Sequence, residues 1–344
     1  MIIRPATLKD VDRLLEFSCQ IPPGMTSMPN DASTWHKKLS IAENCFAPID
    51  QNAKESKIFF LVLEDEHQQL MGTAGVHTEI GLKRPFYNYK VSKQVMASES
   101  LDVTVSCEIL NLVNDFTGAT ELTSLYLSPP ARRKPLGQVM SRCRFLLMHD
   151  FPEFFGDMVF AEIRGWLNEQ ETSPFWEHIG KKFFTMPYKK ADFISAVNGS
   201  QFISDLMPRY PIYLNLMPQE VIDVVGKAHD GAMPAQCLLE KEGFGYRGYV
   251  DIFDAGPVVQ CEREKIVSIN DTEQAIVKQI TAYPGEGEAL RHCILSNRSK
   301  QDYRITASVV KQLDENHIAL DADTAQRLDV SEGNTVSLLA LREN

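Results

Sequence analysis

The chain of 344 residues is long enough for about two domains with substantial hydrophobic cores. Its composition, 44% apolar and 24% charged, is that of an ordinary globular protein, so disorder is not expected. A formal net charge of -11 argues against a nucleic-acid-binding protein, which would normally be basic.

The cysteines and the apolar runs exclude further classes of protein. The seven cysteines are scattered and include no C-x-x-C pair, so neither a disulfide framework nor a zinc site is indicated. No run approaches ~18 apolar residues, and the N-terminus lacks the apolar core of a signal peptide. We therefore expect a cytoplasmic protein that holds no metal and binds neither membrane nor nucleic acid.

The N-terminal part predicts helices and strands in mixed order. They are a strand at 2–6, a helix at 8–21, a helix at 32–46, and strands at 57–65 and 68–81. Thr7 is the expected N-cap of the first helix, and the loop 21–31 is rich in proline and glycine. The last two strands, joined by a polar turn, predict a β-hairpin. Residues 81–120 predict an irregular insertion with short strands.

Residues 123–145, TSLYLSPPARRKPLGQVMSRCRF, pass from a strand through a basic turn into a helix. Leu122, Leu125 and Leu127 suit the strand. Beyond Gly137, the apolar residues form one stripe of a helix: Val139, Met140, Cys143, Leu146 and Leu147. The sequence therefore predicts a strand–turn–helix unit at this point.

An apolar strand at 157–165 comes next. Two later stretches, 173–186 and 233–253, then share one pattern: a proline in the first helical turn, a glycine that ends the helix, and a strand. The two glycines are Gly180 and Gly243. Mixed helix and strand is expected between these stretches.

From about residue 256 the chain consists of short β-type runs with one weak helix near 323–330. The runs lie at 265–269, 303–312, 317–321 and 335–341. They predict a small β-barrel or sandwich. We therefore expect an α+β protein with one domain at 1–255 and a smaller β-rich domain at 256–344.

The basic turn before Gly137 predicts an anion-binding site. A helix N-terminus offers unpaired N–H groups and a partial positive charge, to which Arg132, Arg133 and Lys134 add formal charge. The pattern Arg132-x-x-Pro135-x-Gly137 resembles the R/Q-x-x-G-x-G/A diphosphate loop of acyl-CoA N-acyltransferases of the GNAT superfamily. Pro135 replaces the first glycine and cannot donate an N–H. A solvated basic turn between core elements is the alternative explanation.

Several longer blocks resemble bacterial arginine N-succinyltransferases. They are YNYKVSKQVMASESLDV, NDFTGATEL, AEIRG, SPFWEHIGKKFFTMPYKKADF, LMPRYPIY and LEKEGFGYRGYVDIFDAGP. The resemblance implies a GNAT-like mixed sheet flanked by helices, with a smaller C-terminal β-barrel-like domain. It also implies that succinyl-CoA and L-arginine give CoA and N2-succinyl-L-arginine, the first step of arginine catabolism by this route, in a dimer or higher oligomer.

The same resemblance assigns residues to the site. Leu125 matches the family's succinyl-CoA contact, where a strand backbone can pair with the pantetheine arm. Leu127, Gly137 and the basic turn would complete the cofactor track. His229, in GKAHDGAMPA, matches the family's proton donor and would protonate the departing CoA thiolate. Judged by residue type alone, Leu125 is a core leucine and His229 a surface histidine.

Two carboxylates are candidates for handling the incoming amine. Glu162, in the apolar strand VFAEIRG, is the first candidate for the base or ammonium anchor, and Glu121 is the second. A carboxylate in an apolar strand requires a partner, and pairing with Arg164 is the simpler explanation for Glu162. The guanidinium fork of Arg164 also suits the succinyl carboxylate. Arg164 and Glu121 are therefore expected to bind substrate.

Some positions depart from the family pattern. The loop 22–29 reads PPGMTSMP where consecutive glycines before T-S-L-P are expected, and Met96 and Phe116 stand where histidines are expected. These differences leave ornithine or another amine as an alternative acceptor. Acetyl-CoA as the donor, and a degenerate, non-enzymatic CoA or amino-acid sensor, also remain open.

Overall fold

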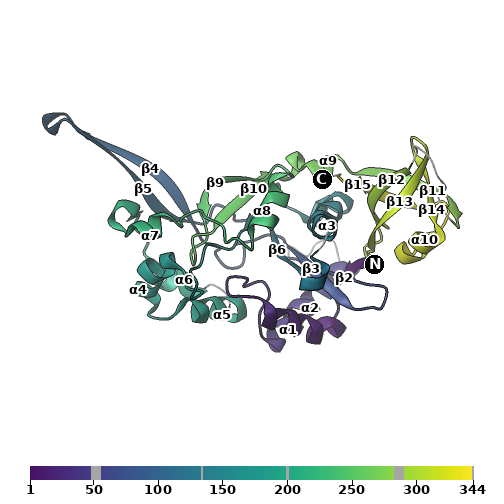
Figure 1. Cartoon of the computed structure of the whole chain (residues 1–344), viewed down its shortest axis with the longest axis horizontal. Coiled ribbons are helices and arrows are strands. Elements are labelled where there is room, and N and C mark those ends of the chain that lie inside the picture. Colours follow the sequence, from purple (N-terminus) through teal and green to yellow (C-terminus); the bar gives the residue numbers. More distant parts are fainter. Residues whose placement is uncertain (48–55, 133–134, 199–200, 283–289, 343–344) are drawn as a thin grey trace.

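The computed structural model describes residues 1–344 except 48–55, 133–134, 199–200, 283–289 and 343–344. Figure 1 shows an elongated molecule with a mixed sheet at its centre. A small β-barrel lies at one end of the long axis, and a two-stranded arm projects from the other end.

The described residues form one continuous sheet of 15 strands with helices around it. The strands are β1 Ile2–Pro5, β2 Ile58–Glu64, β3 Leu70–His77, β4 Asn88–Ser98, β5 Val103–Val113, β6 Thr120–Leu127, β7 Met158–Glu162, β8 Ile212–Tyr213, β9 Gly245–Val250, β10 Pro257–Glu262, β11 Glu273–Thr281, β12 Leu290–Ser296, β13 Ile305–Asp314, β14 His317–Asp321 and β15 Thr335–Ala340. The helices are α1 Val11–Gln20, α2 Ala32–Phe46, α3 Leu136–Asp150, α4 Lys181–Phe184, α5 Tyr188–Asn198, α6 Gln201–Leu206, α7 Gln219–Ile222, α8 Met233–Glu240, α9 Val267–Asn270 and α10 Ala322–Leu328.

The central part of the sheet has the order β1-β2-β3-β6-β7-β10-β9-β4-β5-β8, and only β6 and β7 run parallel in it. Strand β2 is apolar throughout because both of its faces are buried. Phe59 and Leu61 pack against α3 on one face, whereas Phe60 and Val62 pack against α1 and α2 on the other. A strand buried on both faces has a continuous apolar sequence instead of an alternating one.

The five C-terminal strands close into a barrel. Their order is β12-β15-β11-β14-β13, and β12 pairs with β13 to complete the ring. The barrel interior is filled by a separate apolar cluster that includes Val277, Leu295 and Leu338. The prediction of a mixed helix and strand protein with a small β-barrel is confirmed.

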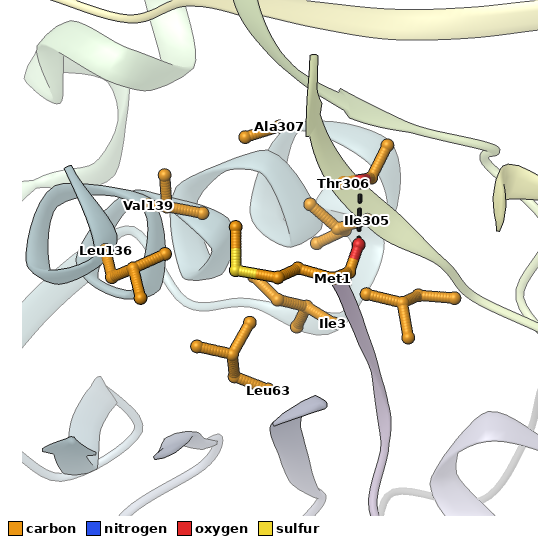
Figure 2. A pocket seen from close by; sticks show the side chains of 9 residues that line it. Met1, Ile3, Leu63, Leu136, Val139, Ile305, Thr306 and Ala307 are labelled. Atoms are coloured by element: carbon orange, nitrogen blue, oxygen red, sulfur yellow. Dashed lines mark hydrogen bonds between the residues drawn. The ribbon is translucent and has the colours of Figure 1, made fainter. Parts of the chain in front are cut away.

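The barrel joins the central sheet where β1 meets β13, with Ile3 opposite Ile305. Figure 2 shows the small apolar pocket at this junction, where Met1 and Ile3 face Leu136 of α3. The Thr306 hydroxyl donates to the Met1 carbonyl at 3.0 Å. The lining is aliphatic apart from Thr306, so this pocket is a packing seam between barrel and body.

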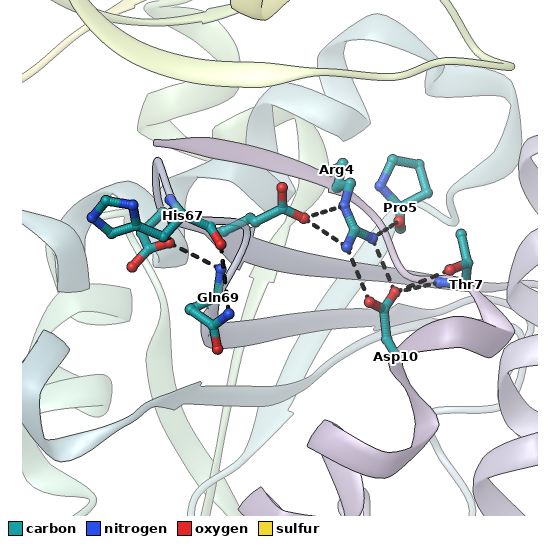
Figure 3. Close-up of polar contacts among 8 residues, drawn as sticks. Arg4, Pro5, Thr7, Asp10, His67 and Gln69 are labelled. Carbon is teal, nitrogen blue, oxygen red and sulfur yellow. Dashed lines mark hydrogen bonds and ion pairs between the residues drawn. The ribbon is translucent and has the colours of Figure 1, made fainter.

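Ion pairing secures the passage from β1 to α1, as Figure 3 shows. The guanidinium of Arg4 lies between Asp10, at 2.9 Å, and Glu64, at 2.7 Å. Thr7 occupies the predicted N-cap position of a 3-10 turn, and its backbone N–H donates to Asp10 at 2.7 Å. The opening strand and helix are therefore tied to β2.

The prediction of an irregular insertion at 81–120 is wrong. Strands β4 and β5 pair over their full length, from Asn88↔Val113 to Ser98↔Val103, and form the projecting arm of Figure 1. Val95 and Met96 near its tip are 61% and 43% exposed. Because the outer arm has no packed face, it lacks the burial pattern by which a half-buried strand is recognised.

The prediction that Gly180 ends a helix before a strand is also wrong. The helix passes through Gly180 as a π-helical turn, Trp176–Gly180, continues as α4 and ends at Thr185, whose φ is 52°. A Cβ on Gly180 would lie 2.3 Å from the Trp176 ring. The glycine therefore serves close packing. By contrast Gly243, with φ of 96°, follows α8 as predicted.

The strand expected at 265–269 is a short helix, α9, and two barrel strands, β11 and β12, were not foreseen. Ser268 of α9 is buried, and its N–H donates to the Glu242 carboxylate at 2.8 Å. This long-range contact decides the local conformation, and a five-residue apolar pattern carries too little information to oppose it.

Candidate functional site

Strands β6 and β7 diverge after their first paired residues. They pair only at Thr120↔Val159 and Glu121↔Phe160, although β6 continues to Leu127. In the described part of the chain, no strand pairs with the β7-facing edge of β6 beyond Glu121. The divergence leaves backbone N–H and C=O groups available to an extended ligand.

A β-bulge lies in this open segment. Ser124 has a φ of 53°, and the register with β3 shifts between Thr73 and Gly75. Before the bulge Leu122 faces α3; after it Leu125 and Leu127 face α3, and both are only partly buried. The extra residue therefore turns the two leucines that were expected to contact the cofactor toward the same side.

The predicted anion site lies where β6 leads into α3. Helix α3 begins at Leu136, and no side chain in the described residues caps its N-terminus. A Cβ on Gly137 would meet nothing within 4 Å, so the space above the first turn is open. Arg132 is exposed, and its Nε donates to the Leu127 carbonyl at 2.9 Å. Arg133 and Lys134 lie outside the described residues.

The C-terminal end of β7 lies in a cluster of three carboxylates, of which Asp254 is buried and Glu162 and Asp251 are half-buried. Glu162 accepts a hydrogen bond from Asn88 Nδ2 at 2.7 Å. Burial, together with the nearby Asp251, raises the pKa of Glu162 well above its usual range. Asn88 Oδ1 is buried without a partner in the described structure. Glu162 has no ion pair with Arg164 among the described contacts, so pairing with that arginine does not explain its burial.

The Asp254 carboxylate holds the backbone at Gly165 and Gly256 in place. It accepts from the backbone N–H of Gly165 at 2.8 Å and from Gly256 at 2.8 Å. A Cβ on Gly165 would lie 2.5 Å from this carboxylate, which explains the glycine in AEIRG. Tyr188 adds its hydroxyl at 3.3 Å. The backbone after β7 is therefore held in one conformation.

Arg164 is half-buried beneath the loop between α1 and α2. Gly24 of that loop lies so close that a Cβ there would be 2.7 Å from the Arg164 side chain. Burial lowers the pKa of Arg164, and its Nε has no hydrogen-bond partner in the described structure. A half-buried guanidinium with an unused, buried donor is well suited to bind a carboxylate.

His229 lies directly beside Arg164. Its backbone N–H donates to the Arg164 carbonyl at 2.8 Å, and the adjacent Ala228 bridges Gly165. The Gly231 N–H donates to His229 Nδ1 at 3.0 Å. Burial and the nearby Arg164 lower the pKa of His229. The lowered pKa favours the neutral imidazole, and the contact with Gly231 makes Nδ1 a hydrogen-bond acceptor.

A second titratable cluster lies under the bulge of β6. Burial raises the pKa of Glu121 to about 7, and the same effect lowers the pKa of Lys38 to about 7. His77 Nδ1 lies 3.9 Å from Glu121, and its Nε2 is buried without a partner in the described structure. The charge of Glu121 helps to raise the pKa of Glu162 across the gap where β6 and β7 diverge.

The structure thus brings together Glu121, Glu162, Arg164 and His229, which lie up to 108 positions apart in the sequence. Sequence reasoning missed Lys38, His77, Asn88 and Asp254. Lys38 had a usable signal, because it lies between Trp35 and Leu39 beside the apolar face of α2. A second usable signal was that Asp251 and Asp254 are acidic residues in the otherwise apolar stretch VDIFDAG.

Further searches of the described residues gave two negative findings. No group of three or more His, Cys, Asp or Glu side chains there is placed to hold a metal ion. Within the same residues, every helix is too short or too polar to cross a membrane.

Comparisons with known proteins identify the family. Residues 1–268 match the family model described as arginine N-succinyltransferase beta subunit, and residues 275–340 match that of its C-terminal domain. The chain belongs to the arginine N-succinyltransferase beta subunit family. The family resemblance read from the sequence is confirmed, and the chain is an acyltransferase.

Individual family members match over the whole chain. Arginine N-succinyltransferase subunit beta of Pseudomonas aeruginosa is 36% identical over 341 residues, which cover 99% of this chain and 98% of the relative. An arginine N-succinyltransferase of Escherichia coli is 34% identical over 342 residues, with the same coverage. The solved structure of arginine/ornithine succinyltransferase subunit AI from Pseudomonas aeruginosa superposes with a TM-score of 0.88 at 32% identity, covering 99% of both chains.

Proposed function

We propose that the protein transfers the succinyl group of succinyl-CoA to the α-amine of L-arginine, giving N2-succinyl-L-arginine and CoA. One observation carries the proposal: the open edge of β6 leads at one end to the N-terminus of α3, which no described side chain caps, and at the other to the Glu121–Glu162–His229 region. The relatives named arginine N-succinyltransferase support the choice of both substrates.

The cofactor track follows the GNAT-like arrangement expected from the sequence. The pantetheine arm pairs with the backbone of β6 at Leu125 and Leu127, as an added strand would. The diphosphate lies on the N–H groups of the first turn of α3, above Gly137, where the helix dipole favours negative charge. Arg132 supplies positive charge at the entrance to this site, and Arg133 and Lys134 follow it directly in the sequence.

The amine attacks the thioester directly, without a covalent enzyme intermediate. Arginine arrives as an ammonium ion and gives one proton to Glu162, or to Glu121 as the second candidate. The neutral nitrogen forms the amide bond, and the carbon–sulfur bond breaks. His229 takes a proton from the nitrogen of the tetrahedral intermediate and, as an imidazolium ion, gives a proton to the departing CoA thiolate. One proton is released to solvent for each CoA thiol formed.

Two side chains bind substrate in this scheme. Arg164 binds a substrate carboxylate with its unused donor, and Glu121 contributes negative charge near the incoming ammonium. No step requires a metal. The division into domains at residue 255, assembly into a dimer or higher oligomer, and a cytoplasmic location remain predictions.

The proposal is tested by the release of CoA thiol from succinyl-CoA in the presence of purified protein. L-Arginine should stimulate release at least ~100-fold over buffer, and acetyl-CoA should be a much poorer donor. Ornithine is tested in parallel, because the solved relative is named an arginine/ornithine succinyltransferase. If neither amine stimulates release, the proposed reaction is wrong. If ornithine stimulates release more than arginine, ornithine replaces arginine as the acceptor and the rest of the proposal stands.

A further inference from the structure

The surroundings of Lys38 are unusual for the ammonium group of a half-buried lysine. Its Nζ donates to the Ser27 carbonyl at 2.6 Å and lies 3.3 Å from the Ser124 hydroxyl. The rings of Phe60 and Trp35 lie 4.8 Å and 5.3 Å away. None of the described carboxylates forms an ion pair with it; Glu121 acts on it only at longer range.

Packing alone does not account for a lysine here. Buried charges are normally paired, and desolvation of an ammonium is only partly offset by two neutral oxygens and two aromatic faces. Burial accordingly lowers the pKa of Lys38 to about 7. An anion bound beside Nζ would offset the desolvation of the ammonium, so the site is suited to bind an anionic ligand.

The position of Lys38 identifies which anion fits. Ser124, its hydroxyl partner, is the bulge residue of β6 and immediately precedes Leu125 on the proposed thioester track. In an extended succinyl group the free carboxylate carbon lies about 4 Å from the thioester carbon, three C–C bonds away. A thioester held on the open edge beside the bulge therefore brings that carboxylate within reach of Nζ.

We propose that Lys38 binds the free carboxylate of the succinyl group and so selects a dicarboxylic acyl-CoA as donor. The inference rests on the proposed function. It assigns the two half-buried cations to two different carboxylates: Lys38, on the β6 side, to the donor, and Arg164, on the β7 side beside His229, to the α-carboxylate of arginine. Lys38 is then the specificity-determining residue for the acyl donor.

The loop between α1 and α2 supports this division. Ser27 of the loop accepts from Lys38 through its carbonyl and from the Ser124 N–H, at 3.2 Å, through its hydroxyl. Three residues earlier, Gly24 presses on Arg164. The loop thus contacts both cations and covers the space between β6 and β7 where the two substrates would meet.

The test compares donors, using Lys38→Met. Butyryl-CoA has a methyl group in place of the distal carboxylate of succinyl-CoA and is otherwise the same length. We expect the ratio of kcat/KM for succinyl-CoA to that for butyryl-CoA to fall at least ~100-fold, the usual loss when a buried charged hydrogen bond is removed. Lys38→Arg, which keeps the charge, should retain most of the preference.

Arg164→Met is the matched control. It should raise the KM for arginine without changing the preference between the two donors. If Lys38→Met lowers kcat/KM for both donors by one factor, or if the donor preference changes in Arg164→Met instead, the assignment of Lys38 is wrong. Should Lys38→Met not fold, Lys38→Arg decides: loss of the preference in that folded variant contradicts a charge-based selection. An inactive wild-type protein would contradict the proposed function itself.

Discussion

Two carboxylates, the buried Asp150 and the half-buried Glu162, show how differently one chain treats the same chemical group. Asp150, at the end of α3, accepts hydrogen bonds from Ser296, Tyr303 and Ser337 and pairs with Arg298 at 3.1 Å. Glu162, at the end of β7, has a single donor among the described residues, Asn88, and acidic neighbours. The first carboxylate is saturated with donors from the barrel, whereas the second retains acceptor capacity.

The difference separates a carboxylate that stabilises the fold from one that is available for catalysis. A saturated buried carboxylate fixes two parts of a structure together, because its removal leaves several partners unsatisfied. An undersatisfied one costs stability but is available to a proton or an ammonium ion. The α3–barrel junction around Asp150 therefore serves the fold, and the end of β7 serves the chemistry.

The largest effect is expected from His229→Ala. Loss of the proton donor should lower kcat by about two to four orders of magnitude, the usual contribution of general acid–base catalysis. The melting temperature should not change, since the side chain is half-exposed and makes one hydrogen bond. His178→Ala, a half-buried histidine outside the site, is the control. A wild-type rate in His229→Ala would remove His229 from the mechanism.

Asp150→Ala should have the next largest effect, and on stability alone. We expect the free energy of unfolding to fall by about 3 kcal/mol, because three hydroxyl groups and Arg298 lose their acceptor. Denaturant titration measures the loss. The variant, assayed while folded, should keep kcat/KM within about threefold. A large loss of activity at full stability would reverse the comparison between the two regions.

Gly137→Leu should weaken CoA binding at least ~10-fold without destabilising the protein. Leucine is a better helix former than glycine, and a Cβ at this position meets nothing in the described structure. The side chain would instead occupy the space proposed for the diphosphate. Calorimetric titration with CoA measures the effect. Unchanged affinity would exclude the first turn of α3 as the diphosphate site.

Glu162→Gln should give the smallest change in stability, with opposite sign to that of Asp150→Ala. A carboxyl group with a raised folded-state pKa makes the protein less stable as pH rises above its unfolded pKa. Removing it should therefore raise the free energy of unfolding at pH 8 by about 1 kcal/mol, with little change at pH 4. Denaturant titration at both pH values is the measurement. Lower stability at pH 8 would mean that Glu162 is a structural group.

The same variant distinguishes the two candidate bases. The pKa of Glu121 lies at about 7, so a base at that position predicts that kcat/KM falls as pH drops below about 7. If Glu162 is the base, Glu162→Gln removes most of the activity and Glu121→Gln raises the KM for arginine. The reverse pattern would make Glu121 the base.

Sequence patterns predicted the elements whose burial is regular. The strand–turn–helix unit around Gly137 was recognisable because β6 carries leucines on a buried face and α3 has a continuous apolar stripe. The projecting arm was missed because the outer halves of β4 and β5 pack against no other described element. Gly180 was misassigned because its role, which is to leave room for the Trp176 ring four residues earlier in the same helix, cannot be told from the sequence pattern.

The candidate site was predictable only where a family motif marks a residue. Nothing local to His229 indicates that it lies beside Arg164, since that contact joins residues 65 positions apart. The position of Lys38 beside the apolar face of α2 could mark it as unusual, but could not show that it faces Ser124, which is 86 positions away in the sequence. Clusters formed by distant segments become visible only once the sheet order is established.

The most direct test of the proposed cofactor track is a crystal structure of the protein with CoA bound. We expect the diphosphate within hydrogen-bond distance of the N–H groups of Leu136 and Gly137, and the pantetheine arm paired with β6 near Leu125. A diphosphate bound elsewhere, with the edge of β6 beyond Glu121 left empty, would contradict the cofactor track and the roles assigned to the residues beside it.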